Sequence, residues 1–225
     1  MTDLTSLEIQ LNTRLGNYIQ KSVIANNELT LEVAPTALYS LCLTLRDDSD
    51  FQFEQLIDIC GIDYAHYGLS EWETSTATCS GFERGVTNEF LQEKTIPFPS
   101  RFAVIYHFLS LTHNHRIRLK VFVPDSMPMV DSIIDIWPAA NWFEREAFDL
   151  YGILFNNHPD LRRILTDYGF IGHPFRKDFP LIGNVEVRYD AELGRVIYEP
   201  VTSIQPRTLV PKTIRDDNRY TNIKG

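Results

Sequence analysis

The sequence predicts an α+β fold, a two-layer domain with a mixed, partly antiparallel sheet and packed helices, followed by an extended C-terminal arm. Three observations carry this prediction. Helix-periodic and strand-alternating segments follow each other in the first part of the chain, two long β-rich runs are joined by a short polar turn, and glycine and proline interrupt every periodic stretch late in the chain. We therefore expect a globular domain over residues 1–152 and a partner-binding arm over residues 153–225.

The elements of the domain follow from local patterns. A first helix is expected over residues 4–19, because one helical face there carries only leucine and isoleucine. Residues 28–33 alternate between apolar and polar side chains, as a half-buried strand does. Pro35 suits the first position of a second helix. The buried face of that helix would consist of Leu38, Leu41, Cys42 and Leu45.

The rest of the sheet is predicted from β-rich runs. Residues 56–64 are typical of a strand, and residues 101–112 and 116–123 form two longer runs. The polar residues between these two runs predict an antiparallel hairpin with its tip at residues 113–115. Residues 81–86 are a further short candidate strand, in a stretch to which we assign no motif.

Composition narrows the class of function. A chain of 225 residues with 44% hydrophobic content can bury one sizeable core. The formal net charge is −9, and an acidic body repels phosphate, which makes nucleic acid a poor partner. The locally basic residues 207–224 suit an acidic partner. Cys42, Cys60 and Cys79 are too far apart in sequence to indicate a disulfide framework or an iron–sulfur site.

Targeting and membrane signals are also missing from the sequence. No apolar run approaches the roughly 20 residues that span a bilayer. The first ten residues lack the features of a signal or transit peptide. If the protein works at a membrane, we expect other subunits to hold it there.

A helix rich in charge and aromatics is expected over residues 142–151, starting after Asn141 and stopping at Gly152. A projection at about 100° per residue places Glu144 on its apolar side. Three interpretations of this carboxylate stay open. It bonds back to the backbone of Asn141 as part of a capping box, pairs with an arginine of the following segment, or acts as an acid–base group.

The opposite side of this helix carries Trp142, Arg145, Glu146 and Asp149. Arg145 and Asp149 are four residues apart, so they can form a salt bridge on a polar face. A solvated face is the simplest interpretation. An exposed tryptophan beside an arginine is typical of binding hot spots, however, and this favours a partner interface.

The segment after the helix combines histidines, prolines and charges. His158 and His173 each precede a proline, so we expect them to project from an extended chain, and no ligand spacing ties them into a metal site. Asp160 is expected to cap a short helix from about residue 161. The charged residues Arg162, Arg163, Arg176, Lys177 and Asp178 suit ion pairing with a partner, with a solvated basic turn as the alternative.

Three stretches of this region, EREAFDLYG (144–152), HPDLRRIL (158–165) and GHPFRKDFP (172–180), resemble the family of the C subunit of NADH-quinone oxidoreductase, respiratory complex I. The resemblance implies a non-catalytic scaffold in the peripheral arm of the proton-translocating NADH:quinone reductase. Such a scaffold would pack chiefly against the D subunit, at the quinone site, and also near the B subunit. It would carry no cofactor, because FMN and the iron–sulfur clusters belong to partner subunits. It would lie peripherally on the cytoplasmic side of the bacterial inner membrane, or on the matrix side in mitochondria.

The motif inventory agrees with that role. GxGxxG after a strand, GxxxxGKS/T, GxSxG and a cysteine framed by histidine and aspartate are all missing from the sequence, so we expect no catalytic, cofactor-binding or metal-binding residues. The alternatives are an equivalent subunit of a membrane-bound hydrogenase or of a plastid-type NAD(P)H dehydrogenase, a free metalloenzyme and a homodimeric binding module. The residues expected at the partner interface are Trp142, Glu144, Arg145, Glu146, Asp149, His158, Asp160, Arg162, Arg163, His173, Arg176, Lys177 and Asp178.

Overall fold

The computed structural model describes residues 4–65, 67, 98–180 and 183–201, which belong to two compact units. The first unit takes the described residues up to Phe179, and the second takes those from Pro180 onward. The predicted strand at 81–86, Cys79 and the basic stretch 207–224 lie outside the described residues.

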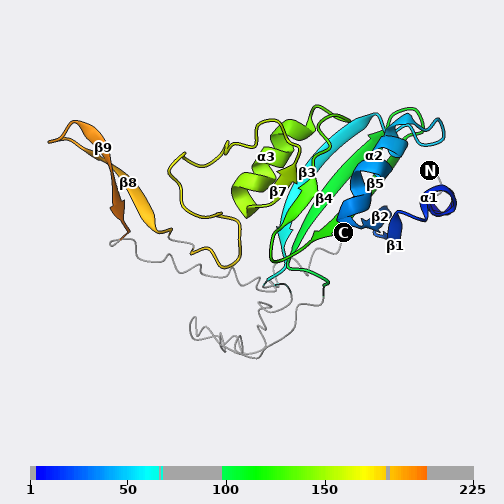
Figure 1. Ribbon diagram of the computed structural model, residues 1–225, viewed down its shortest axis with the longest axis horizontal. Helices are drawn as coiled ribbons and strands as arrows, with labels where there is room; N and C mark the ends of the chain where they lie inside the picture. Colours follow the sequence, from blue (N-terminus) through cyan, green and yellow to red (C-terminus); the bar gives the residue numbers. More distant parts are fainter. Residues whose placement is uncertain (1–3, 66, 68–97, 181–182, 202–225) are drawn as a thin grey trace, which may run out of the picture. The chain divides into compact units, whose positions relative to one another are not determined.

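The first unit is built on a five-stranded sheet with the strand order β1-β2-β5-β4-β3 (Figure 1). The strands are β1 (Ile19–Ala25), β2 (Glu28–Val33), β3 (Gln55–Asp63), β4 (Phe102–Ser110) and β5 (His115–Val123). The pair β2–β5 is parallel, and the other neighbouring pairs are antiparallel. The predicted α+β class with a mixed, partly antiparallel sheet is therefore confirmed.

The predicted hairpin is β4 followed by β5. Its register runs from Phe102 opposite Val123 to Ser110 opposite His115. The connecting turn includes Asn114 at φ 53°, a left-handed conformation that asparagine tolerates better than most residues. The predicted tip is confirmed, with His115 already paired in the ladder.

Strand β1 was missed by the sequence analysis. The first helix, α1 (Leu4–Leu15), ends four residues earlier than predicted, and Ile19 begins a strand instead of ending a helix. β1 and β2 are joined by Asn26 and Asn27 at φ 52° and 62°. Two consecutive residues at positive φ form the tight connection that the twist of a β-hairpin favours. The polar pattern of β1 hid it, because most of its side chains are exposed.

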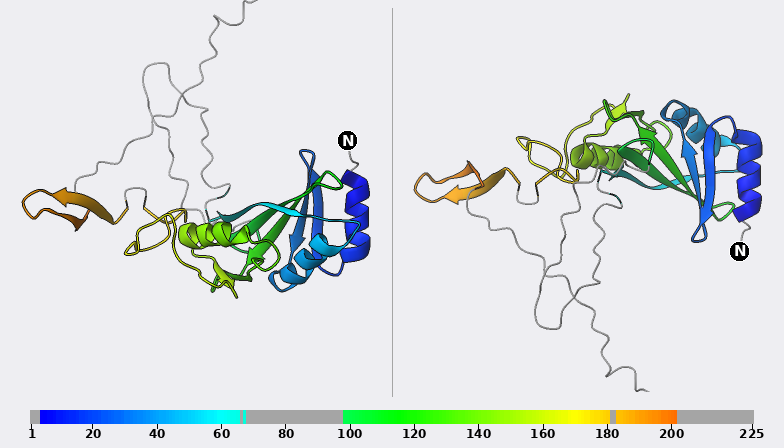
Figure 2. Two further views of the ribbon diagram at one scale, coloured as in Figure 1. Left: turned by 90° about the horizontal axis from the view of Figure 1, so that it is seen from above. Right: turned by 90° about the horizontal axis from the view of Figure 1, so that it is seen from below.

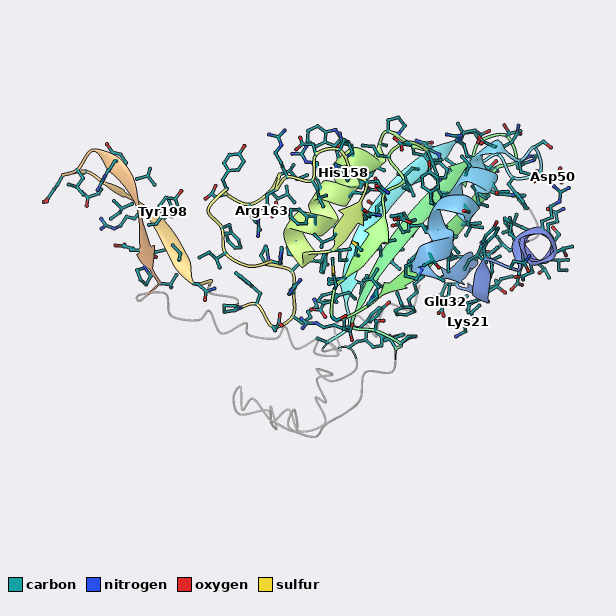
Figure 3. The ribbon with its side chains drawn as sticks, in the orientation of Figure 1. Lys21, Glu32, Asp50, His158, Arg163 and Tyr198 are labelled. Carbon is teal, nitrogen blue, oxygen red and sulfur yellow. The ribbon has the colours of Figure 1, made fainter. Side chains whose placement is uncertain are left out.

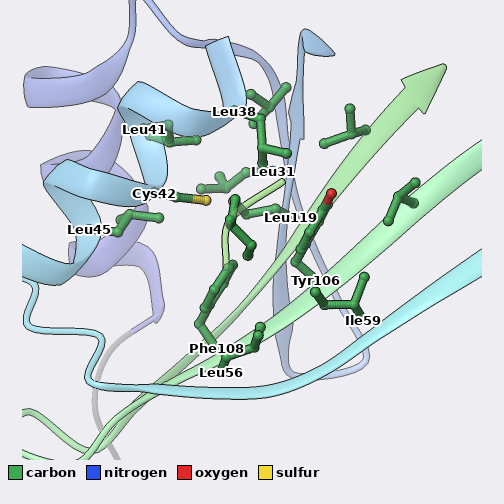
Figure 4. Close-up of a cluster of buried hydrophobic side chains, with 14 of the residues drawn as sticks. Leu31, Leu38, Leu41, Cys42, Leu45, Leu56, Ile59, Tyr106, Phe108 and Leu119 are labelled. Atoms are coloured by element: carbon green, nitrogen blue, oxygen red, sulfur yellow. The ribbon is translucent and has the colours of Figure 1, made fainter. Parts of the chain in front are cut away.

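One hydrophobic core joins the helices to the sheet. α1 packs beside β1 and β2 (Figure 2). A short 3-10 turn, η1 (Pro35–Ala37), leads into α2 (Leu38–Asp47), whose predicted face is fully buried. Figure 4 shows that face, Leu38, Leu41, Cys42 and Leu45, directed at side chains of the sheet. Ala140 and Ala147 of α3 (Ala140–Tyr151) belong to the same cluster.

The segments just before and just after α3 in the sequence form a second sheet of two strands. β6 (Met129–Asp131) and β7 (Leu154–Asn156) pair in parallel, one before and one after the helix. This corrects the expectation that a short helix would be the only regular structure after Gly152. The short helix expected from about residue 161 does not form, because residues 164–166 adopt bends whose backbone amides are bound by the Asp149 side chain of α3.

The first compact unit continues to Phe179, although we expected the domain to stop at residue 152. Ile153 and Phe155 are buried in its core, and Leu161 packs against it. The part of the expected arm up to Phe179 therefore folds on its own domain.

The second unit contains a separate antiparallel hairpin, β8 (Val185–Asp190) and β9 (Arg195–Pro200). Val187 faces Tyr198 and Tyr189 faces Val196 across the strands, and all four side chains are exposed. A two-stranded hairpin by itself is at best marginally stable in water. Over both units, the described helices include none that is long and apolar enough to cross a membrane.

Candidate partner-binding surface

Helix α3 and the chain that follows it, the signature segment (residues 140–179), carry every predicted interface residue. α3 lies close against β3 because Gly61 has no side chain, and a Cβ there would lie 2.6 Å from the ring of Tyr151. The helix stops at Gly152 as predicted, in the left-handed conformation at φ 75°. The start was predicted less well. The N-cap is Ala139, so Asn141 is not the cap.

Glu144 is fully buried, as its projection predicted, but its partners were not among the expected ones. Its Oε2 accepts from the Ser132 hydroxyl at 2.6 Å, and its Oε1 accepts from the Ile133 amide at 2.9 Å. Ser132 and Ile133 are thus the hydrogen-bond partners of Glu144, where the sequence analysis expected the Asn141 backbone or an arginine. Burial raises the pKa of Glu144 to about 7, although the Ser132 and Ile133 hydrogen bonds act against that shift. The carboxylate thus ties α3 to the loop after β6.

Asp149 is also fully buried, which contradicts its predicted place on a polar helix face. Its Oδ2 accepts from the backbone amides of Ile164, Leu165 and Thr166 at 2.7 to 3.0 Å. Its Oδ1 accepts from Arg163 at 3.0 Å and from the Thr166 hydroxyl. Burial alone would raise the pKa of Asp149, but these hydrogen bonds outweigh it and lower the pKa to about 2. The conformation of residues 163–166 is therefore fixed by hydrogen bonds to Asp149, and not by the predicted short helix.

The last carbonyls of α3 receive donors from the end of the signature segment. The four final carbonyls of a helix lack partners within the helix. Here His173 Nδ1 lies 2.9 Å from the Asp149 carbonyl, the Phe175 amide donates to Leu150, and Arg176 Nε donates to Tyr151 at 2.6 Å. His173 and Arg176 are thus used inside the chain. The expected projection of His173 is corrected.

A second anchor joins the signature segment to the end of β3. Asp63, whose side chain is buried, accepts from Arg101 through two nitrogens at 2.7 and 2.9 Å and from the Lys177 amide at 2.8 Å. Arg101 also bridges to Asp178 at 3.0 Å. The side chains of Lys177 and Asp178 remain largely exposed. Sequence reasoning missed Asp63 and Arg101, because the bonds of this anchor join residues that are 38 to 114 positions apart in the chain.

The remaining predicted residues divide between the interior and the surface. His158 does not project, because its side chain is fully buried beside Glu144. Arg145 does not pair with Asp149. Its Nε donates to the Arg162 carbonyl at 3.0 Å, and its guanidinium stacks 5.1 Å from the Trp142 ring. Glu146 is half-buried. Asp160 and Arg162 form an exposed salt bridge at 2.8 Å. Figure 3 shows Arg163 and His158 on the chain beside α3.

The signature segment exposes several large apolar side chains among its polar ones. Its largest exposed side chains are Trp142 at 61%, Leu165 at 60%, Tyr168 at 90%, Ile171 at 76% and Phe175 at 54% exposure. We call these five residues the apolar signature surface. Their aromatic composition is typical of binding hot spots. Of these five, the sequence analysis named only Trp142 as an interface residue, because nothing local distinguishes Leu165 and Ile171 from core residues.

The histidines and carboxylates of the signature segment were also compared with the requirements of a metal-binding site. Among the described residues, no group of three or more histidine, cysteine, aspartate or glutamate side chains is arranged to hold a metal ion. Asp149 already accepts five hydrogen bonds, and His173 already contacts the helix end.

Comparisons with known proteins point to one family. The model of the family described as the 30 Kd subunit of respiratory-chain NADH dehydrogenase matches residues 31–185. The C subunit of NADH-quinone oxidoreductase from Coxiella burnetii is 57% identical over 98% of this chain and 96% of the relative. The C subunit of Legionella pneumophila is 54% identical over 100% of this chain and 98% of the relative. The C subunit of Halorhodospira halophila is 52% identical over 98% of this chain and 94% of the relative.

Solved structures agree at the level of the fold. Nqo5, solved as a trypsin-resistant fragment (1-134), is 25% identical with a TM-score of 0.51, over 69% of this chain and 98% of that one. A chain of the membrane-bound sulfane sulfur reductase, an archaeal respiratory membrane complex, has a TM-score of 0.56 at 16% identity. The match covers 80% of this chain and 88% of that one. The second likeness concerns the fold alone.

Proposed function

Because this chain belongs to the family of the NADH-quinone oxidoreductase C subunit, the 30 Kd subunit of respiratory-chain NADH dehydrogenase, we propose that it is a non-catalytic scaffold of that complex. It packs chiefly against the D subunit and lies near the B subunit. It supports electron transfer from NADH to quinone without a cofactor of its own. FMN and the iron–sulfur clusters reside in partner subunits, and the assembly holds this chain at the cytoplasmic side of the membrane.

One observation carries the proposal. Asp149 with Arg163, and Arg176 with the end of α3, fix the chain after the helix on the domain, while the apolar signature surface stays exposed. Exposed apolar surface of this kind on a rigid support is typical of a protein interface. Asp149 and Glu144 are locked in hydrogen bonds, as structural groups are.

The β8–β9 hairpin supports a second contact with a partner. Its aligned face of Val185, Val187, Tyr189, Val196 and Tyr198 is exposed in the hairpin as described. A partner that covers this face supplies the further layer that an isolated hairpin lacks. We propose that this part of the arm docks on the same assembly.

The test is a mild-detergent pull-down of the full-length tagged chain from membranes, followed by identification of the partners. Tyr168→Ala and Ile171→Ala are expected to reduce recovery of the D subunit at least tenfold while the chain stays folded. Leu111→Ala, at an exposed position in the turn between β4 and β5, is the matched control and should recover the full complex. Recovery of a nickel-containing hydrogenase instead would favour the related-complex alternative. Equal recovery by all variants would remove the proposed surface.

A further inference from the structure

A cleft of about 510 Å³ lies at the end of the five-stranded sheet where the parallel strands β2 and β5 begin. The turn between β1 and β2 lines one part of it, β3 and β4 contribute Ile57 and His107, and β5 contributes residues 115–118. We call it the sheet-end cleft. Sites for small organic molecules commonly have volumes of about 300 to 1,000 Å³. The cleft therefore has room for an organic molecule, and a bare inorganic ion would fill only a small part of it.

Two guanidinium groups line the cleft, and only one of them is already paired. Arg118 donates to the Glu28 carboxylate and to the Thr30 hydroxyl. Among the residues that the structure describes, the guanidinium of Arg116 forms no ion pair and no hydrogen bond. Its side chain is exposed, so it is accessible to a ligand. One cationic fork is thus left without a partner at the cleft.

Two imidazoles add polar nitrogens to the same cleft. The Nδ1 atom of His115 is buried and has no hydrogen-bond partner in the described part of the chain. Buried polar atoms of side chains usually have one. Burial lowers the pKa of His115 and of His107, so both rings are neutral at neutral pH. They offer hydrogen-bonding nitrogens to a ligand without adding charge.

The cleft also has an apolar side. Leu4 of α1 and Ile57 of β3 line it, and Ile57 is 36% exposed. Ile57 lies at the irregularity between Leu56 and Asp58, where the pairing of β3 with β4 shifts its register. A bulge of this kind can redirect a side chain. An aliphatic group that covers Leu4 and Ile57 would remove apolar surface from water, which favours binding.

Charge selects the class of ligand. The charged residues that line the cleft are two arginines and Glu28, which leaves one positive charge in excess on a chain whose formal net charge is −9. A single negative charge balances this excess, whereas a phosphate dianion would leave negative charge uncompensated beside Glu28. The planar guanidinium fork also matches the two oxygens of a carboxylate. We propose that the sheet-end cleft binds a small organic monocarboxylate, with its carboxylate on Arg116 and its aliphatic body against Leu4 and Ile57.

The test is a titration of the full-length ¹⁵N-labelled chain with octanoate, below its micelle concentration and at neutral pH. Two-dimensional ¹H–¹⁵N spectra follow the backbone amides. Saturable shifts are expected at Asn27, His115 and Arg116, and they should exceed those at Leu165 and Tyr168 of the apolar signature surface. Octanol has the body without the charge, and acetate has the charge without the body. Each is expected to bind about tenfold more weakly than octanoate or less well still.

Three variants locate the charge. Arg116→Gln, at an exposed position, is expected to weaken octanoate binding about tenfold, because a charge-assisted hydrogen bond is lost. Arg116→Lys keeps the charge and should retain most of the affinity. Lys21→Gln is the matched control, since it removes an exposed cation of β1 that does not line the cleft, and it should bind like wild type.

Four results would overturn the proposal. They are equal affinities for octanol and octanoate, displacement of octanoate by equimolar inorganic phosphate, equal losses in Arg116→Gln and Lys21→Gln, and shifts confined to the apolar signature surface. All measurements use the free chain, so they stand or fall independently of docking to the D subunit.

Discussion

Asp149 of α3, fully buried, and Arg163 of the following segment, partly buried, form a salt bridge with 3.0 Å between Oδ1 and Nη1. Arg163 extends the link, because its Nη2 donates to the Gly172 carbonyl at 2.9 Å. One carboxylate thus organises two separate turns of a segment that has little regular structure. A pair with one fully buried member is costly to break, because removal of one partner leaves the other charge uncompensated.

Replacement of Asp149 by alanine is expected to lower the free energy of unfolding by about 3 to 5 kcal/mol. The substitution strands the Arg163 guanidinium and the backbone amides of residues 164–166. Urea unfolding at neutral pH measures the loss. Asp167→Ala, at an exposed position two residues beyond Leu165, serves as the control and should change stability by less than about 0.5 kcal/mol. Similar losses for the two variants would contradict the assigned role.

Asp149 also predicts an acid limit of stability. Its folded pKa of about 2 is depressed from the ordinary value of 3.8, so its contribution is present above pH 3.8 and is lost as pH falls through about 2. The contribution amounts to roughly 2 to 3 kcal/mol. Unfolding of wild type and Asp149→Asn between neutral pH and pH about 2 should show curves that converge in acid. A constant difference across this range would rule out the depressed pKa.

The sequence predicted local features and failed where partners are distant. The leucine face of α2 and the stop at Gly152 depend on neighbouring residues, and both are confirmed. The helical projection placed Asp149 on a polar face, and the proline after His158 predicted that this side chain would project. In the structure, Asp149 is buried by backbone amides 15 to 17 residues further along the chain, and His158 is buried beside Glu144. The prolines did remove helices after residue 152. Arg176, which the sequence analysis placed at a partner interface, donates to the Tyr151 carbonyl of α3 instead.

Gly152→Ala is expected to destabilise the domain by about 1 to 3 kcal/mol through its backbone conformation alone. At φ 75° a side chain is strained, and a Cβ would lie 2.5 Å from Arg176 Nη2 and 2.6 Å from His173 Nε2. The clash also displaces the two side chains that satisfy the end of α3. Thermal unfolding measures the effect. Gly169→Ala is the control, since a Cβ there meets nothing within 4 Å. Equal melting temperatures for the two variants would show that Gly152 is not needed at the helix end.

Glu144→Ala is expected to cost about 1 to 3 kcal/mol, because the Ser132 hydroxyl and the Ile133 amide lose their acceptor. Glu144→Gln isolates the charge. The folded pKa of about 7 lies above the ordinary 4.5, so wild type loses stability as pH rises from 4.5 through about 7, by roughly 3 kcal/mol. The free energy of unfolding of the glutamine variant lacks this dependence on pH. The variant should therefore become more stable relative to wild type as pH rises. Parallel pH profiles for the two proteins would refute the raised pKa.

Trypsin is expected to cut the free chain after Arg188 or Arg195 in the β8–β9 hairpin, before it cuts after Arg163 or Arg176. Proteases need a locally unfolded substrate, and a two-stranded hairpin with an exposed apolar face opens readily. Arg163 and Arg176 lie in chain that is held to α3 by partly buried hydrogen bonds, so cleavage there requires those bonds to break first.

In the assembled complex the hairpin sites should become resistant, since a covering partner removes the open state that the protease needs. Asp149→Ala provides the matched comparison, because it loosens residues 163–166 without touching the hairpin, and it should add cleavage after Arg163 in the free chain. Mass spectrometry of the early fragments identifies each site. Hairpin sites as resistant in the free, monomeric chain as in the complex would mean that β8 and β9 are covered by their own chain, and docking of this part of the arm on a partner would have to be abandoned.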